Sequence, residues 1–136
     1  SLTPYMIGAG PYIAPHSKAA PNPWREDPML FFRVMALLRI LNPFAHIPAT
    51  TAFDALLPGG RAQLLSTCAN VMMPSFTPGE FKLDYHLYPK KSVVDDGLWH
   101  PGAAPKTLET MGLTIGKGPG HSLLMKHTPS DKENEE

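Results

Sequence analysis

Cysteine and net charge are both scarce in this sequence. Cys68 is the single cysteine among 136 residues, so the chain forms no disulfide of its own and cannot by itself build a thiolate cluster. Its 12 basic and 12 acidic residues cancel, and no global field therefore draws it toward nucleic acid or anionic lipid. We expect neither a nucleic acid nor a membrane as a partner.

Long apolar runs are absent as well. The longest, from Met29 to Leu41, is interrupted by Arg33 and Arg39 and is too short to span a bilayer. No signal-peptide pattern is visible at the start of the sequence, which begins at Ser1 and not at Met. We therefore expect a soluble protein of the cytoplasm or of an organelle matrix, with an upstream portion missing. The sequence leaves the choice of compartment open.

Clusters of metal-ligating residues are missing too. No pair among the six histidines has the H-x-x-H or H-E-x-x-H spacing that is typical of helical zinc sites. The adjacent carboxylates of Asp95 and Asp96 fall in an expected loop, where such groups are usually solvated. We expect this chain to form no metal site of its own.

Proline and glycine, by contrast, are abundant, with 16 and 11 residues, and most of them separate short apolar segments. These segments alternate between expected strands and expected helices. Each strand is continuously apolar and does not alternate in polarity, which indicates a parallel sheet covered by helices. The strands are expected at residues 5–10, 46–50 and 71–73, and the helices that follow them at residues 28–41, 61–68 and 78–86.

The first of these helices has the clearest limits. Asp27 is a suitable N-cap, Pro28 suits the first helical position, and the Asn42-Pro43 pair ends the helix. Apolar residues recur at positions i, i+4, i+7, i+8 and i+11, which predicts one apolar face packed on the core. These residues are Leu30, Val34, Leu37, Leu38 and Leu41.

The remainder of the chain carries weaker signals. Residues 106–111 are expected to form a terminal helix that ends at Gly112, and the charged residues 130–136 are expected to be disordered. We accordingly divide the chain into a βα part, residues 1–112, and a loop-rich, flexible tail, residues 113–136. Three βα units would leave open sheet edges, because a closed parallel barrel needs about eight strands. We therefore expect a missing N-terminal half, in the same chain or in a partner.

Several motifs, taken together and in this order, resemble one protein family. They are M-I-G-A-G-P-Y-I from Met6, A-L-L-R-I-L-N-P from Ala36, I-P-A-T-T-A from Ile47, P-G-G-R from Pro58, A-N-V-M-M-P from Ala69 and Y-H-L-Y-P from Tyr85. Together they are similar to the C-terminal part of HydE-like proteins, the radical S-adenosylmethionine (SAM) maturases of [FeFe]-hydrogenase, which are related to biotin synthase and methylornithine synthase. The similarity extends over roughly residues 5–89.

The resemblance implies a TIM-type (β/α)8 radical SAM barrel, of which this chain supplies the three C-terminal βα units. SAM and a [4Fe–4S] cluster would lie at the carboxyl ends of the strands, where reductive cleavage of SAM yields a 5′-deoxyadenosyl radical. By the same resemblance, Met6 and Ile13 pack on the adenosyl group of SAM. Thr50 and Thr51 would bind an anionic or carboxylate group of a small-molecule substrate.

Each of the remaining candidate positions has two interpretations. By resemblance, Tyr85 and Tyr88 bind the substrate at the end of the cavity, whereas from pattern alone they are amphipathic residues that close the barrel end. The hydroxyls of Thr50 and Thr51 can alternatively satisfy backbone groups at the strand end. Residues 58–60 can either present N–H groups to an anion at a helix start or simply form a turn.

The sequence also departs from the family in ways that bear on activity. The CxxxCxxC triad that binds the cluster is absent, and Cys68 occupies a position that the family usually gives to glycine, so we expect it to pack and not to ligate iron. The chain alone is therefore expected to be inactive. Two hypotheses stay open. One is the C-terminal portion of a radical SAM enzyme of the HydE, biotin synthase or methylornithine synthase type, and the other is a non-catalytic truncated or split binding module.

Overall fold

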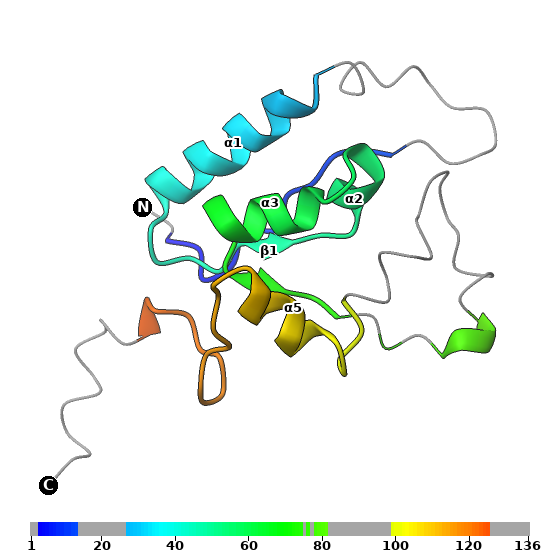
Figure 1. Ribbon diagram of the computed structural model, residues 1–136. Coiled ribbons are helices and arrows are strands. Elements are labelled where there is room, and N and C mark those ends of the chain that lie inside the picture. Colours follow the sequence, from blue (N-terminus) through cyan, green and yellow to red (C-terminus); the bar gives the residue numbers. More distant parts are fainter. Residues whose placement is uncertain (1–2, 14–26, 75, 77, 82–98, 126–136) are drawn as a thin grey trace, which may run out of the picture.

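Figure 1 shows the computed structural model of the chain, which describes residues 3–13, 27–74, 76, 78–81 and 99–125. Helices and short strands alternate along this part of the chain, in agreement with the predicted α/β class. The elements in chain order are α1 (Pro28–Leu41), β1 (Pro48–Ala49), α2 (Ala52–Leu56), α3 (Gly60–Thr67), β2 (Val71–Met72), η2 (Gly79–Phe81) and α5 (Ala104–Thr110).

The extended segments run parallel to one another, as the sequence predicts. Strand β1 pairs with β2 so that Pro48 lies opposite Val71. On its other side, Met6 forms an isolated parallel bridge with His46, in which the N–H of Ile7 donates to the His46 carbonyl at 2.8 Å. The pairing is shorter than expected, because each strand has two residues and the segment around Met6 makes a single bridge.

The helices agree with the predicted positions only in part. Helices α3 and α5 begin and end within two residues of the expected limits, whereas α2 was not expected. The helix predicted at residues 78–86 is represented by the short 3₁₀ turn η2, and its remaining residues lie outside the described part of the chain. Residues 130–136, expected to be disordered, also lie outside it. The described residues therefore contain no third complete βα unit.

A single core fills the space between the strands and the two longer helices. In the view of Figure 1, α1 and α3 lie above the strands and α5 lies below them. Side chains from all of these elements are buried together, and Cys68 is among them, as expected for a packing residue. The core cluster consists of Phe32, Met35, Ile47, Ala49, Phe53, Leu64, Leu65, Cys68, Ala69, Trp99 and Leu108.

Helix α1 has the predicted limits but not the predicted core face. Asp27 caps the helix, because its side-chain oxygen accepts a hydrogen bond from the N–H of Leu30 at 3.3 Å. Phe32 and Met35 are the buried residues of the helix. In contrast, Val34, Leu37 and Leu41 of the predicted face are 43%, 54% and 67% exposed. The prediction holds for Leu38, which packs partly buried against the core, and is wrong for these three residues. The helix is apolar on both faces, and periodicity does not say which face meets the core.

The side chain of Arg39 joins the end of α1 to the starts of both strands. Its Nε donates to the Cys68 carbonyl at 2.8 Å, one Nη donates to the Ala45 carbonyl at 2.8 Å, and the other to Oδ1 of Asn70 at 2.9 Å. The same Asn70 oxygen accepts the N–H of Ile47 at 2.8 Å. Backbone groups at the amino ends of β1 and β2 are thereby satisfied by side chains.

Residues near the C-terminus reach back to this same edge of the strands. The Nε2 atom of His46 lies 2.9 Å from the Gly120 carbonyl, and the hydroxyl of Ser122 donates to the Phe44 carbonyl at 3.2 Å. Ser122 is itself buried. Part of the segment assigned to a loop-rich tail therefore covers the amino ends of the strands.

Replacement of Gly60 by alanine should strongly destabilise the fold. A Cβ atom at Gly60 would lie 2.7 Å from the carbonyl carbon of Phe53, and backbone cannot move aside as a flexible side chain can. We expect Gly60→Ala to lower the free energy of unfolding by about 1–3 kcal/mol in urea denaturation. Gly116→Ala is the matched control, because a Cβ there has no neighbour within 4 Å. Equal stability of the two variants would contradict the close packing at Gly60.

Candidate functional site

The carboxyl ends of the parallel segments meet at Thr50 and Gly10. Thr50 directly follows β1, and Gly10 follows the segment that bridges to His46. A Cβ atom placed on Gly10 would lie 3.0 Å from Oγ1 of Thr50, so the two residues face each other with no side chain of Gly10 between them. In open and closed parallel sheets, ligands bind at this end of the strands.

The hydroxyl of Thr50 is buried and lacks a hydrogen-bond partner within the described residues. The backbone carbonyl of Thr50 accepts the N–H of Phe53 at 3.2 Å, but the side chain takes no part in that turn. The alternative in which this hydroxyl satisfies strand-end backbone groups is therefore not observed. A buried hydroxyl without a partner costs about 1–3 kcal/mol, which a bound polar atom would remove.

Thr51 has a different setting from its neighbour. It occupies the N-cap position of α2, but its side chain makes no capping hydrogen bond to that helix. Its carbonyl accepts the N–H of Asp54 at 3.2 Å. The two threonines predicted as a pair are thus adjacent at the strand exit, with the Thr50 hydroxyl against Gly10.

A buried ion pair, which the sequence did not reveal, lies just beyond the threonines. Asp54 of α2 accepts hydrogen bonds from both the backbone N–H and the Nε of Arg61, the first at 2.9 Å. The two side chains are 8% and 2% exposed. The guanidinium also lies over the ring of Trp99, 5.0 Å from its centroid. The only sequence signal was an acidic and a basic residue on either side of a Pro-Gly-Gly turn.

The ion pair and the turn together fix the corner between α2 and α3. Gly59 has a φ of 74°, which favours glycine, and the N–H of Gly60 donates to the Leu57 carbonyl at 2.9 Å. Because the next N–H, that of Arg61, is bonded to Asp54, both groups at the helix start are occupied. Residues 58–60 therefore form a turn, and the anion-binding alternative for them is not supported.

The other predicted site residues are only partly described. Met6 lies in the parallel bridge and is 56% exposed, whereas Ile13 is buried at 9% exposure. Tyr85 and Tyr88 lie outside the described residues. Contacts of these four residues with SAM or substrate stay predictions.

Neither a metal site nor a membrane-spanning element is found in the described part of the chain. No three of its histidine, cysteine, aspartate and glutamate side chains are grouped so that they could hold a metal ion. Within the same residues, every helix is too short or too polar to cross a bilayer.

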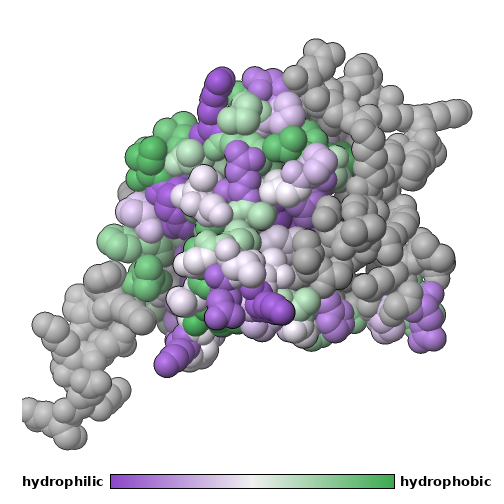
Figure 2. Space-filling view, viewed as in Figure 1, coloured by the Kyte–Doolittle hydropathy of each residue, from purple (hydrophilic) through white to green (hydrophobic). Residues whose placement is uncertain are grey.

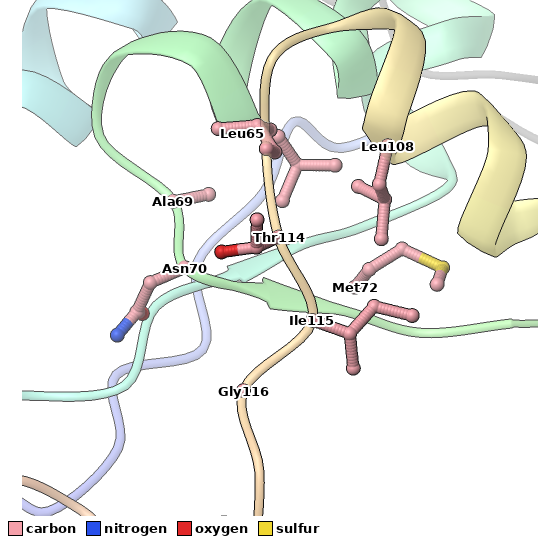
Figure 3. Close-up of a pocket in the computed structure, with 9 residues that line it drawn as sticks. Leu65, Ala69, Asn70, Met72, Leu108, Thr114, Ile115 and Gly116 are labelled. Carbon is pink, nitrogen blue, oxygen red and sulfur yellow. The ribbon is translucent and has the colours of Figure 1, made fainter.

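A cavity of about 340 Å³ lies between α3, β2 and α5, as Figure 3 shows. It is apolar except for Asn70 and Thr114, and neither Thr50 nor Gly10 lines it. The cavity is therefore separate from the place where Thr50 and Gly10 meet. Its lining residues are Leu65, Ala69, Asn70, Met72, Leu108, Leu113, Thr114, Ile115 and Gly116.

Comparison with known proteins gives one informative match. No protein-family model matches the chain. The chain is, however, 43% identical over 89 residues to the [FeFe] hydrogenase maturase subunit HydE of Thermotoga maritima. It resembles a C-terminal portion of HydE. This identity confirms the resemblance predicted from the motifs.

The match covers only part of each of the two proteins. It includes 65% of this chain but 26% of HydE, so the chain spans about a quarter of the length of that relative. Gly10 and Thr50 belong to two of the motifs from which the resemblance was predicted, M-I-G-A-G-P-Y-I and I-P-A-T-T-A.

Removal of the Asp54 carboxylate should leave the Arg61 guanidinium buried without its counter-ion. We expect Asp54→Ala to lower the free energy of unfolding by roughly 3–5 kcal/mol, measured by urea denaturation. The double variant Asp54→Ala/Arg61→Met should be more stable than the single variant, because it buries no unpaired charge. If the double variant loses as much free energy of unfolding as Asp54→Ala and Arg61→Met lose in sum when each is made alone, the two residues do not interact.

Proposed function

We propose that this chain is the C-terminal portion of a HydE-like radical SAM protein and forms part of its SAM and substrate cavity. The identity to HydE and the parallel βα arrangement support a (β/α)8 barrel completed by βα units outside this chain. The observation that carries the proposal is the buried, unpartnered hydroxyl of Thr50 at the carboxyl end of β1. Ligand-binding groups of such barrels lie at this end.

Thr50 would bind an anionic oxygen of the substrate. A threonine hydroxyl can donate one hydrogen bond, and a carboxylate oxygen accepts such a bond from a neutral donor without any proton transfer. Gly10 keeps the adjacent space open, because any larger residue would place a Cβ 3.0 Å from that hydroxyl. Thr51, the next residue at the strand exit, would contribute a second hydroxyl to the same group.

SAM and a [4Fe–4S] cluster are the cofactors of the intact protein in this proposal, and when bound they supply the radical by reductive cleavage of SAM. The cluster ligands would come from outside this chain, which contains a single, buried cysteine. This chain would contribute Met6 and Ile13 against the adenosyl group. Exposed Met6 has the surface for such a contact, whereas buried Ile13 presents little. Tyr85 and Tyr88 would close the substrate end.

Loss of the Thr50 hydroxyl should weaken substrate use without loss of stability. In the intact, reconstituted protein we expect Thr50→Val to lower substrate-dependent turnover about 10- to 100-fold, because one hydrogen bond to a charged group is missing. Its melting temperature should be unchanged or higher, since the hydroxyl has no protein partner. Thr50→Ser should retain most of the activity. Thr110→Val, at an exposed position of α5, is the matched control. Unchanged turnover in Thr50→Val would refute the role of this hydroxyl.

The chain alone should not cleave SAM. We expect no 5′-deoxyadenosine above background after anaerobic iron–sulfur reconstitution and reduction of the 136-residue polypeptide, because one cysteine cannot supply the three thiolates of a cluster-binding triad. The same assay on the polypeptide joined to its N-terminal half should give 5′-deoxyadenosine. Failure of the joined protein to cleave SAM would favour the non-catalytic binding module.

A further inference from the structure

Arg61 is buried on a helix whose other polar side chains lie at the surface. The residues that α3 exposes are polar, and Figure 2 shows a mostly hydrophilic to neutral surface over this helix. Arg61 is the charged residue of α3, yet it is 1% exposed and contacts Asp54 and the ring of Trp99. Arginine is rarely buried completely unless it is paired. Burial of this charge is therefore a cost that another property of the fold has to offset.

Stability alone does not account for the ion pair. Desolvation of two buried charges offsets much of their attraction, and apolar side chains of similar volume often serve stability equally well. An apolar pair, however, supplies no direction. The two carboxylate oxygens of Asp54 accept from two donors of one residue, the backbone N–H and the Nε of Arg61. Such paired bonds fix both the position and the orientation of the carboxylate.

Helix α2 depends on contacts of this kind for its own position. Its five residues are too few to form a stable helix alone, and Thr51 at the N-cap makes no side-chain capping bond to it. Phe53 anchors the helix in the core, where it is 0% exposed and its ring centroid lies 5.7 Å from that of Phe32. Asp54, the next residue, is anchored by Arg61. Two anchors at successive residues fix both the depth of α2 and its rotation about the helix axis.

The first turn of α2 in turn holds the backbone of the two threonines. The N–H of Phe53 donates to the Thr50 carbonyl, and the N–H of Asp54 donates to the Thr51 carbonyl, each at 3.2 Å. A displacement of Asp54 would therefore pull on the chain that carries the Thr50 hydroxyl. That hydroxyl faces Gly10 of another extended segment, so such a displacement would change the distance between them.

We propose that Arg61 is a positioning residue of the candidate site, which acts through Asp54 and the first turn of α2 to hold the Thr50 hydroxyl facing Gly10. The proposal rests on the proposed function for what Thr50 binds, but not for where Thr50 is held. A binding group that is already held in one orientation loses less freedom when its ligand arrives. Trp99, whose ring lies over the guanidinium, limits the movement of Arg61 itself.

Methyl NMR of the intact protein tests this role. Threonine would be labelled with ¹³C at its methyl group, and the Thr50 signal would be assigned by its disappearance in Thr50→Val. Three-bond couplings to the methyl carbon report whether the side chain keeps one χ1 rotamer or averages over several. Asp54→Ala/Arg61→Met removes the ion pair, whereas Arg61→Lys keeps the positive charge. The methyl signal of Thr110, at an exposed position of α5, is the internal control.

We expect a single Thr50 rotamer in the parent and in Arg61→Lys, and rotamer averaging in the double variant, with Thr110 unchanged in all three. A cooperative urea transition shows that the double variant is folded. If it is not, Arg61→Met takes its place, because it keeps the hydrogen bond from the backbone N–H to Asp54. A folded variant without the ion pair in which Thr50 keeps the parent rotamer would overturn the proposal. Equal averaging at Thr110 would also overturn it, because the loosening would then be general.

Acetate separates this role from the proposed function. Its carboxylate has the chemistry proposed for the group that Thr50 binds, so the Thr50 methyl signal of the parent should shift and saturate. The double variant should need about ten-fold more acetate, the effect of one poorly directed hydrogen bond. Equal acetate affinity in the two proteins would overturn the positioning role. No shift in the parent would refute carboxylate binding by Thr50, while the rotamer result would stand.

Discussion

The hydrogen bonds of Arg39 are the constraint on which the described fold depends. One guanidinium at the end of α1 holds the Cys68 and Ala45 carbonyls and the Asn70 side chain, and Asn70 in turn holds the N–H of Ile47. The two strands are too short to fix their register through backbone pairing alone. Side-chain bonds at their amino ends therefore set where each strand begins, and consequently where Thr50 leaves the sheet.

The two ends of the strands differ in how completely their polar groups are satisfied. At the amino ends, the side chains of Arg39, Asn70, His46 and Ser122 each make a hydrogen bond to a neighbouring group. At the carboxyl end, the Thr50 hydroxyl is buried without a hydrogen-bond partner among the described residues. In parallel barrels the amino ends serve stability and the carboxyl ends serve ligand binding. The hydrogen bonds of the described residues follow the same division.

Local signals in the sequence predicted the limits of α1, α3 and α5 to within two residues, because caps act within a few residues. Asp27 and Pro28 begin α1, and Gly112, at a φ of 72°, follows α5. The core face of α1 could not be predicted in this way. A helix with apolar residues on both sides satisfies the same periodicity twice, and only the packing of Phe32 on Phe53 decides between them.

The sequence predicted where the candidate site lies, but not which interactions its residues make. The motifs identified Thr50, yet its lack of a partner depends on how closely Gly10 approaches from another strand. The Asp54 and Arg61 pair was invisible because it joins two helices across a turn. A buried hydroxyl without a partner and an exposed apolar helix face both raise the free energy of the folded chain unless another group covers them. Both lie beside Gly10, which approaches the Thr50 hydroxyl and, with Leu30 and Val34 of α1, lines an apolar groove.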